Sequence, residues 1–104
     1  MNIFVLDTCP TIAAQMQCDK HVVKMPLECA QMLSTVHRHY GSDDVQLYKS
    51  THKHHPCTLW AATSRANYAW LFDHFRALND EYFHRYYKNH LSWTKLRDVL
   101  AEPP

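Results

Sequence analysis

The stretch Ser64–Lys88, SRANYAWLFDHFRALNDEYFHRYYK, decides the fold class of this 104-residue chain. Its large apolar and aromatic side chains recur every three or four residues, the period of a helix that lays one broad face on a core. Ser64 stands where an N-cap is expected, so we predict the longest helix from about Arg65 to Lys88. The repeating positions are Tyr68, Leu71, Phe72, Phe75, Leu78, Tyr82 and Tyr86.

A second helical pattern precedes this stretch and runs from about Asp19 to Tyr40. Pro26 lies inside it, and a proline in a helix removes a hydrogen bond and clashes with the preceding turn, at a cost of about 3 kcal/mol. We therefore expect a kink or a break near Val22 to Met25, with His21 and Glu28 meeting across the bend. Gly41 is expected to end the helix as a C-terminal glycine.

Shorter patterns fill the rest of the chain. Ile3–Leu6 is an apolar run that suits a short strand or an extended segment in the core. A short helix with Pro10 in its first turn should follow, capped by Asp7 or Thr8. Ser92 is the expected N-cap of a final helix.

Length and composition support a single helical unit. A chain of 104 residues suits one domain. Its one glycine argues against glycine-rich phosphate loops and the dinucleotide fingerprint, which both need several glycines. We therefore predict a mainly α fold, a compact single domain over residues 1–104 with four or five helices and a short extended N-terminal segment.

The net charge and the cysteine content indicate which partners and which cellular compartment to expect. Eleven Lys and Arg against ten Asp and Glu give a net charge of +1, so no global positive field indicates a nucleic-acid partner, although nine histidines add charge below neutral pH. Four cysteines without a signal-peptide pattern suggest free thiols in a reducing cytoplasm. No apolar run approaches the roughly 20 residues that cross a bilayer, so no membrane partner is expected.

The densest chemistry lies in Asp19–Glu28, DKHVVKMPLE. In a helix, His21, Lys24 and Glu28 share one face. Glu28 could stabilise a positive transition state or shuttle a proton, with His21 orienting it, and Lys20 or Lys24 could act as an amine nucleophile. The alternative is that these charges form weak solvated pairs.

A basic loop, Val45–Pro56, and the aromatic residues after it suggest contacts with phosphates and bases. The alternative is a solvated connector with aromatic residues in the core. A polar stripe at intervals of seven residues along the longest helix could face a cleft or water. The candidate ligand-binding and phosphate-binding residues are Lys49, Lys53, His54, His55, Trp60, Arg65, Asn67, His74, Glu81, Arg85 and Lys88.

Metal binding has weaker support. Cys18 and His21 have ligand spacing, and His54 and Cys57 could complete a tetrahedral zinc site. The chain contains neither CxxC nor HExxH, and buried, inert cysteines explain the same residues. We expect no metal and no cofactor.

Several motifs together resemble a family. They are Asp19-Lys20-His21-Val22-Val23-Lys24-Met25, Glu28, His55-Pro56-Cys57 with Trp60, Asn67-Tyr68-x-Trp70-Leu71 and Glu81-Tyr82-x-x-Arg85-Tyr86-x-Lys88-x-His90. This combination, which covers nearly the whole chain, resembles small tailed-phage proteins described as similar to pyrimidine-dimer DNA glycosylases of the phage endonuclease V type.

The resemblance implies a mostly helical domain that binds duplex DNA. In those glycosylases a freed N-terminal amine attacks the sugar carbon to give a Schiff base, and a glutamate supports that chemistry. Glu28 matches the glutamate and His21 a neighbouring polar residue. This chain opens Met1-Asn2, and a large second residue disfavours removal of the initiator methionine, so the amine of Met1, Lys20 or Lys24 is the expected nucleophile.

Two main functions remain open from the sequence. The first is cleavage of the N-glycosidic bond in damaged DNA, with subsequent strand cleavage. The alternative is a small phage protein that binds or degrades a nucleotide signal of host defence, and a third possibility is an accessory protein without chemistry. DNA or a small nucleotide is the expected partner, a homodimer through Tyr82 to Tyr86 is considered, and the expected location is the cytoplasm of an infected host.

Overall fold

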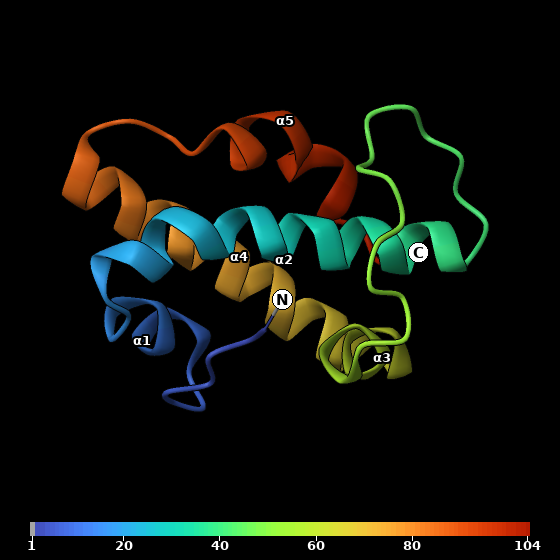
Figure 1. Ribbon diagram of the computed structural model, residues 1–104, viewed down its shortest axis with the longest axis horizontal. Helices are drawn as coiled ribbons and strands as arrows, with labels where there is room; N and C mark the ends of the chain where they lie inside the picture. Colours follow the sequence, from blue (N-terminus) through green and yellow to red (C-terminus); the bar gives the residue numbers. More distant parts are fainter. Residues whose placement is uncertain (1) are drawn as a thin grey trace.

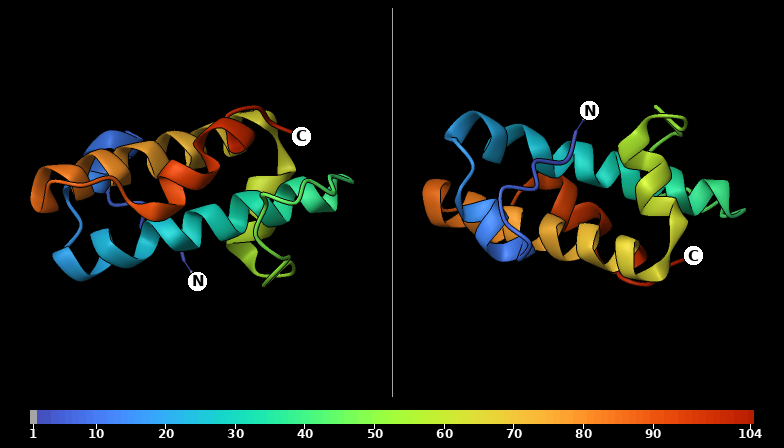
Figure 2. Two further views of the ribbon diagram at one scale, coloured as in Figure 1. Left: turned by 90° about the horizontal axis from the view of Figure 1, so that it is seen from above. Right: turned by 90° about the horizontal axis from the view of Figure 1, so that it is seen from below.

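Two long helices, α2 (Asp19–His39) and α4 (Arg65–Tyr86), pack together through the middle of the computed structural model, which describes residues 2–104 (Figure 1). On one side α1 (Pro10–Gln15) and α3 (Pro56–Thr63) cover opposite ends of α4, and α5 (Leu91–Leu100) lies on the other side (Figure 2). No residue in the range 2–104 is in a strand. The predicted mainly α, single-domain bundle is confirmed, with five helices.

The core lies between the long helices. Met32 and Leu33 of α2 and Leu71, Phe75 and Leu78 of α4 are fully buried. Burial of one such side chain stabilises the fold by roughly 1.5–3 kcal/mol. The predicted apolar face of α4 is therefore correct over its first four turns. Near its end the face reaches the surface, where Tyr82 is half-buried and Tyr86 is exposed.

α2 runs as one continuous helix through Pro26, so the predicted break is wrong (Figure 1). Pro26 is itself buried, and α2 packs against α3, α4 and α5. Burial along this helix outweighs the roughly 3 kcal/mol that an internal proline costs. As a consequence His21 and Glu28 do not meet across a bend, but lie two turns apart on one side of the same helix.

The ends of the two long helices follow the sequence signals. Ser64 Oγ accepts a hydrogen bond from the Asn67 N–H at 3.1 Å and caps α4, as predicted. Gly41 follows the last residues of α2 at φ +98°, a left-handed conformation that glycine adopts without strain. Its N–H donates to the Arg38 carbonyl, and the Ser42 N–H donates to the His37 carbonyl, a Schellman arrangement. The predicted glycine stop is confirmed.

The caps of the two short terminal helices differ from the prediction. Cys9, and neither Asp7 nor Thr8, precedes α1, and the Asp7 carboxylate accepts from the Cys9 N–H at 2.8 Å. His90 caps α5 through Nδ1, which accepts from the Ser92 N–H at 3.1 Å. Histidine is an uncommon N-cap, so the sequence pattern favoured the nearest serine instead.

His74, in the middle of α4, is only 1% exposed. Its Nδ1–H donates to the Pro10 carbonyl at 3.0 Å, and its Nε2 accepts from the Gln17 side-chain amide at 3.1 Å. These two bonds tie α1 and the turn after it to α4, and they require the neutral imidazole. Burial lowers the pKa of His74, because the charged form loses its hydration.

We predict that the protein loses stability as pH falls below about 6.5, the ordinary histidine pKa. There the unfolded chain binds a proton that folded His74 resists, so the free energy of unfolding falls by up to about 1.4 kcal/mol per pH unit for each such histidine. His74→Gln should reduce the slope of melting temperature against pH between 7 and 5. The control His84→Gln, at an exposed position of the same helix, should keep the wild-type slope. Equal slopes for wild type and H74Q would contradict the assignment.

Candidate functional site

The extended N-terminal segment, residues 2–6, lies along one side of α2. The Phe4 ring stacks on the His21 ring with centroids 4.3 Å apart and planes 9° from parallel. Toward the chain start, the Cys57 Sγ–H donates to Asn2 Oδ1 at 3.6 Å, which joins the segment to α3. The segment thus passes from the first turns of α2 toward α3, and the described chain begins beside the middle of α2 (Figures 1 and 2).

Glu28 lies further along α2 than the Phe4–His21 stack. It is 7% exposed and follows His21 by seven residues, which places it on the same side of α2, about 10.5 Å along the helix axis. Met25 and Met32, one turn before and after it, are buried. Burial and, secondly, the Glu28 carboxylate raise the pKa of the neighbouring Cys29 thiol. Cys29 therefore stays protonated, and Glu28 is the functional group of interest on this surface.

The predicted lysine nucleophiles lie at the edge of this surface. Lys20 and Lys24 are both exposed, and Lys24 is one turn before Glu28 on the helix. Desolvation, which activates a catalytic lysine, is small for exposed side chains. The other candidate, the amine of Met1, lies outside the described residues.

The side of α2 that carries Glu28 leads past the buried Met32 and Thr35 to a hollow at the other end of the helix. His39 follows Glu28 by eleven residues, about three turns, so the two residues share one side. His39, Lys53 and His54 line a hollow of about 80 Å³ between α2 and α3. Lys49 is exposed in the loop between those helices. The sequence predicted the loop cations but not His39, whose position depends on the length of the unbroken helix.

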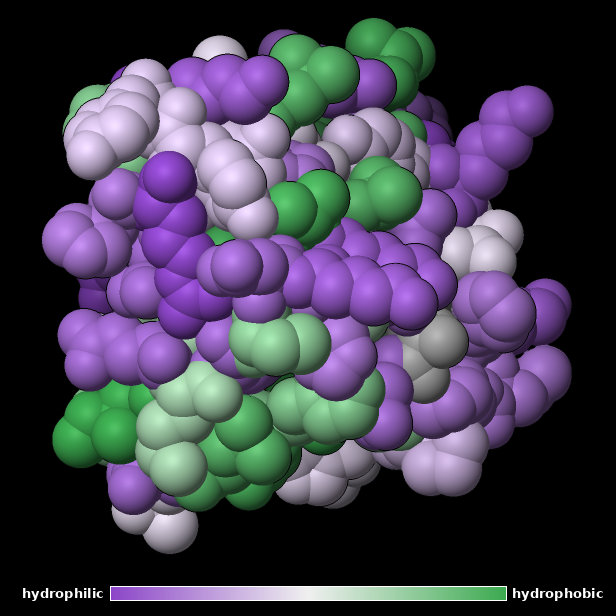
Figure 3. All heavy atoms as spheres, turned by 60° about the vertical axis from the view of Figure 1, so that its left-hand side comes forward, coloured by the Kyte–Doolittle hydropathy of each residue, from purple (hydrophilic) through white to green (hydrophobic). Residues whose placement is uncertain are grey.

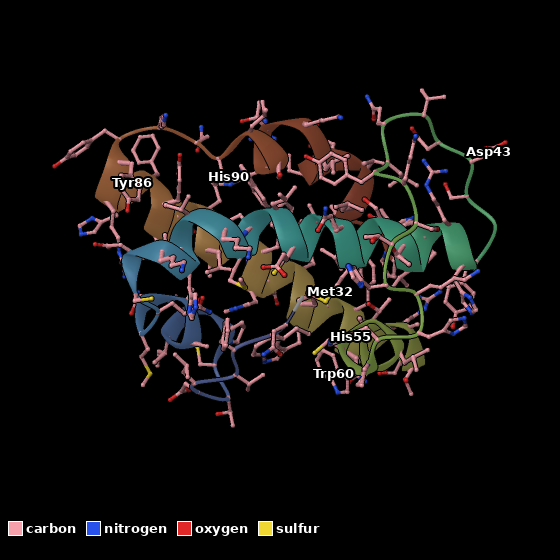
Figure 4. The ribbon with its side chains drawn as sticks, viewed as in Figure 1. Met32, Asp43, His55, Trp60, Tyr86 and His90 are labelled. Atoms are coloured by element: carbon pink, nitrogen blue, oxygen red, sulfur yellow. The ribbon has the colours of Figure 1, made fainter. Side chains whose placement is uncertain are left out.

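His55 and Asn67 hold the α3 region together. His55 Nδ1 accepts from the Cys57 N–H at 3.1 Å and caps α3, and Asn67 Nδ2 donates to the Trp60 carbonyl at 2.8 Å. Trp60 is 38% exposed and meets Trp70 edge to face. Figure 4 shows His55 and Trp60 on α3, which packs on the part of α2 that carries Met32. Trp60 is the residue of this group with a surface available to a ligand.

Arg65, at the start of α4, is exposed and lines a second hollow of about 230 Å³. Tyr40 and the C-terminal residues Pro103 and Pro104 line it too. The sequence predicted Arg65 as a phosphate contact but did not indicate Tyr40. Arg65 therefore stays a candidate for DNA contact beyond the loop.

The predicted polar stripe along α4 does not line one cleft. His74 is buried and bonded within the fold, and Lys88 lies beyond the end of the helix. Arg85 pairs with Asp19 and Glu81, each at 2.9 Å, and joins the end of α4 to the start of α2. Figure 3, which looks at this end of the molecule, shows a hydrophilic band between hydrophobic patches. The carboxylates of these pairs reduce the value of Arg85 as a phosphate contact.

The weak zinc candidates do not come together. His21 stacks on Phe4, Cys57 contacts Asn2, and Cys18 is an exposed residue before α2. In residues 2–104 no group of three or more His, Cys, Asp or Glu side chains is arranged to hold a metal ion. The ligand spacing of Cys18 and His21 is thus a local consequence of the turn that starts α2.

Comparison with known proteins connects the chain to DNA. No curated protein and no solved structure matches it. None of the helices in the described range is long and apolar enough to cross a bilayer. The family model of the pyrimidine dimer DNA glycosylase matches residues 1–95, and the protein therefore belongs to that family.

Proposed function

We propose that this protein cleaves the N-glycosidic bond of a pyrimidine dimer in duplex DNA and then cleaves the strand. The observation that carries the proposal is the placement of Glu28, a buried carboxyl on the side of α2 along which the N-terminal segment packs. Family membership supports the substrate class. Glu28 is the proposed catalytic acid.

The proposed nucleophile is the N-terminal amine of the chain. The segment that leads to this amine contacts α2 through Phe4, which stacks on His21, and contacts α3 through Asn2, which accepts from Cys57. An α-amine has an ordinary pKa of about 7.7–8.0, against about 10.4 for a lysine side chain, so more of it is unprotonated at neutral pH. Lys20 and Lys24 are exposed, whereas a catalytic lysine is activated by desolvation.

In the proposed reaction Glu28 is the one carboxyl group that takes part. The amine nitrogen attacks C1′ of the damaged nucleoside, and the electron pair of the C1′–N bond leaves with the base, which takes up the proton that the attacking nitrogen gives up. Glu28 donates a proton to the ring oxygen as the sugar opens, and the nitrogen becomes a protonated Schiff base. The Glu28 carboxylate next removes a proton from C2′, which expels the 3′ phosphate. Water finally hydrolyses the Schiff base and frees the amine.

The DNA contacts proposed for this face are the exposed cations of the loop and α3 region. Lys53 and His54 lie beside His39, on the same side of α2 as Glu28, and Lys49 is in the same loop. Phosphate contacts of this kind fix the register of the protein on the duplex. Trp60 offers an exposed aromatic surface for stacking.

The family match points to DNA, so the alternative of a nucleotide-binding or nucleotide-degrading phage protein has no finding in its support. The homodimer through Tyr82 to Tyr86 stays a prediction. In the monomer these two rings already contact each other, with centroids 5.0 Å apart.

We predict that Glu28→Gln keeps the fold and lowers the single-turnover rate of ring opening and strand nicking by about 10²–10⁴-fold, the usual contribution of general acid–base catalysis. The amide has nearly the same shape as the carboxyl but cannot exchange the proton. Base release and nicking are measured on duplex containing one dimer, and melting temperature reports folding. The control Glu102→Gln, at an exposed site, should act as wild type. Wild-type rates in E28Q would refute the proposed acid.

The nucleophile can be identified by trapping the Schiff base with borohydride. One glycine added before the first residue displaces the amine by about 3.5 Å and should abolish the trapped complex. The double variant Lys20→Ala/Lys24→Ala should be trapped at the wild-type rate. Mass spectrometry of the digested complex should find the sugar on the N-terminal peptide. A sugar on Lys20 or Lys24 instead would overturn this assignment.

The phosphate contact of Lys53 predicts a change in salt dependence. Each phosphate contact contributes about −0.9 to the slope of log affinity against log salt concentration, so Lys53→Ala should make the slope shallower by about one. Lys95→Ala is the matched control, because Lys95 lies on α5 above the Tyr48 ring. Binding of undamaged duplex is measured by anisotropy from 50 to 200 mM salt. Equal slopes for K53A and K95A would exclude the contact.

A further inference from the structure

We infer that His21 is a positioning residue, whose ring stacks on Phe4 and sets the register of the N-terminal segment against Glu28. This inference rests on the proposed function, because it concerns the delivery of the amine nucleophile. It differs from the role expected from the sequence, in which His21 orients the carboxylate of Glu28 itself.

The stack has the geometry of a specific contact. The two ring centroids are 4.3 Å apart and the planes are 9° from parallel. Both residues are half-buried, and Ile3 and Phe4 pack against the hydrophobic core. An exposed, mobile segment would not keep two flat rings in parallel contact, so the stack fixes the segment at one point of α2.

A second, weaker contact lies two residues nearer the chain start. The Cys57 Sγ–H donates to Asn2 Oδ1 at 3.6 Å, and Cys57 is in the first turn of α3. From Phe4 to Asn2 an extended chain covers at most about 7 Å, which directs the segment from the start of α2 toward its middle. Two anchors on two helices therefore define both the position and the direction of the segment.

The register matters because extended residues advance about 3.3–3.6 Å each. A slip by one residue would move the amine that far relative to Glu28. Misplacement of a reacting group by about 1 Å can cost 10²-fold in rate. A shift of one register position exceeds this tolerance, and the contacts of Phe4 and Asn2 act against such a shift.

The imidazole nitrogens of His21 are not needed for this role. His21 and Glu28 are two helical turns apart, about 10.5 Å along the axis, which is too far for a direct hydrogen bond. The stack needs only a flat ring of similar size. A phenylalanine at position 21 should therefore preserve the positioning, whereas an acid–base role would be lost with the nitrogens.

The test compares His21→Ala, His21→Phe, Phe4→Ala and the double variant Phe4→Ala/His21→Ala. Borohydride trapping on dimer-containing duplex is followed under single-turnover conditions at saturating protein. We expect H21A and F4A each to slow trapping at least ten-fold with an unchanged Kd for the duplex. H21F should stay within about three-fold of wild type. The double variant should be no slower than either single variant, because both remove the same contact.

Docking of the segment is measured separately and without DNA. The nuclear Overhauser contacts between the rings of residues 4 and 21 should be present in wild type and H21F, and the N-terminal segment should lose its contacts to α2 in H21A. Melting temperatures show whether each variant is folded.

The outcomes separate this inference from the proposed function. Trapping of H21A at the wild-type rate, or H21F as slow as H21A, would overturn the positioning role. A wild-type protein that shows the docked segment but no trapped complex would contradict the proposed function instead. Trapping that is lost in H21A and kept in H21F supports both.

Discussion

The site depends on the continuity of α2 through Pro26. An α-helix advances 1.5 Å per residue, so an unbroken α2 fixes His21, Glu28 and His39 at set intervals along one side. The N-terminal segment covers the first part of that side, and α3 with the preceding loop covers the last part. Glu28 lies between them. A break at the proline would have separated the carboxyl from both coverings.

The distance between Glu28 and His39 along α2 can be compared with the spacing of phosphates along DNA. Eleven helical residues from Glu28 to His39 correspond to about 16.5 Å along the axis. Successive phosphates of one DNA strand advance about 3.4 Å along the duplex, so this distance corresponds to about five nucleotides. A duplex lying along α2 with its damaged sugar at Glu28 would bring a phosphate several nucleotides away to Lys53 and His54. One rigid helix thus relates the reacting group to the phosphate contacts.

The elements of the fold could be predicted from the sequence where local signals decide them. The apolar period of α4, the Ser64 cap and the Gly41 stop depend on residues within a few positions of one another. The continuity of α2 could not be predicted, because its local cost is offset by packing on three other helices. Local patterns also cannot show that histidines 55 and 90 provide the caps.

The site was predictable in part for the same reason. The helical face with His21 and Glu28 follows from spacing within one segment. The burial of His74 and the Arg85–Asp19 ion pair involve partners more than fifty residues earlier in the chain. The Phe4–His21 stack likewise joins two separate segments. Periodicity therefore placed His21 and Glu28 on one face, while only the tertiary structure shows that the N-terminal segment contacts α2 and α3.

The net charge of +1 does not describe how the charges are distributed, because some cations lie beside carboxylates and others are exposed at the surface. Arg76, Arg85 and Arg97 each lie within 4 Å of an aspartate, so much of their field is cancelled locally. The exposed cations Lys20 and Lys24 lie on α2 before Glu28, and Lys49, Lys53 and Arg65 belong to the loop and to the start of α4. Under the proposed function, such a surface would contact few phosphates and bind undamaged DNA weakly. Recognition would then depend on the damaged site itself, where a nucleotide with weakened stacking costs less free energy to expose to the carboxyl group.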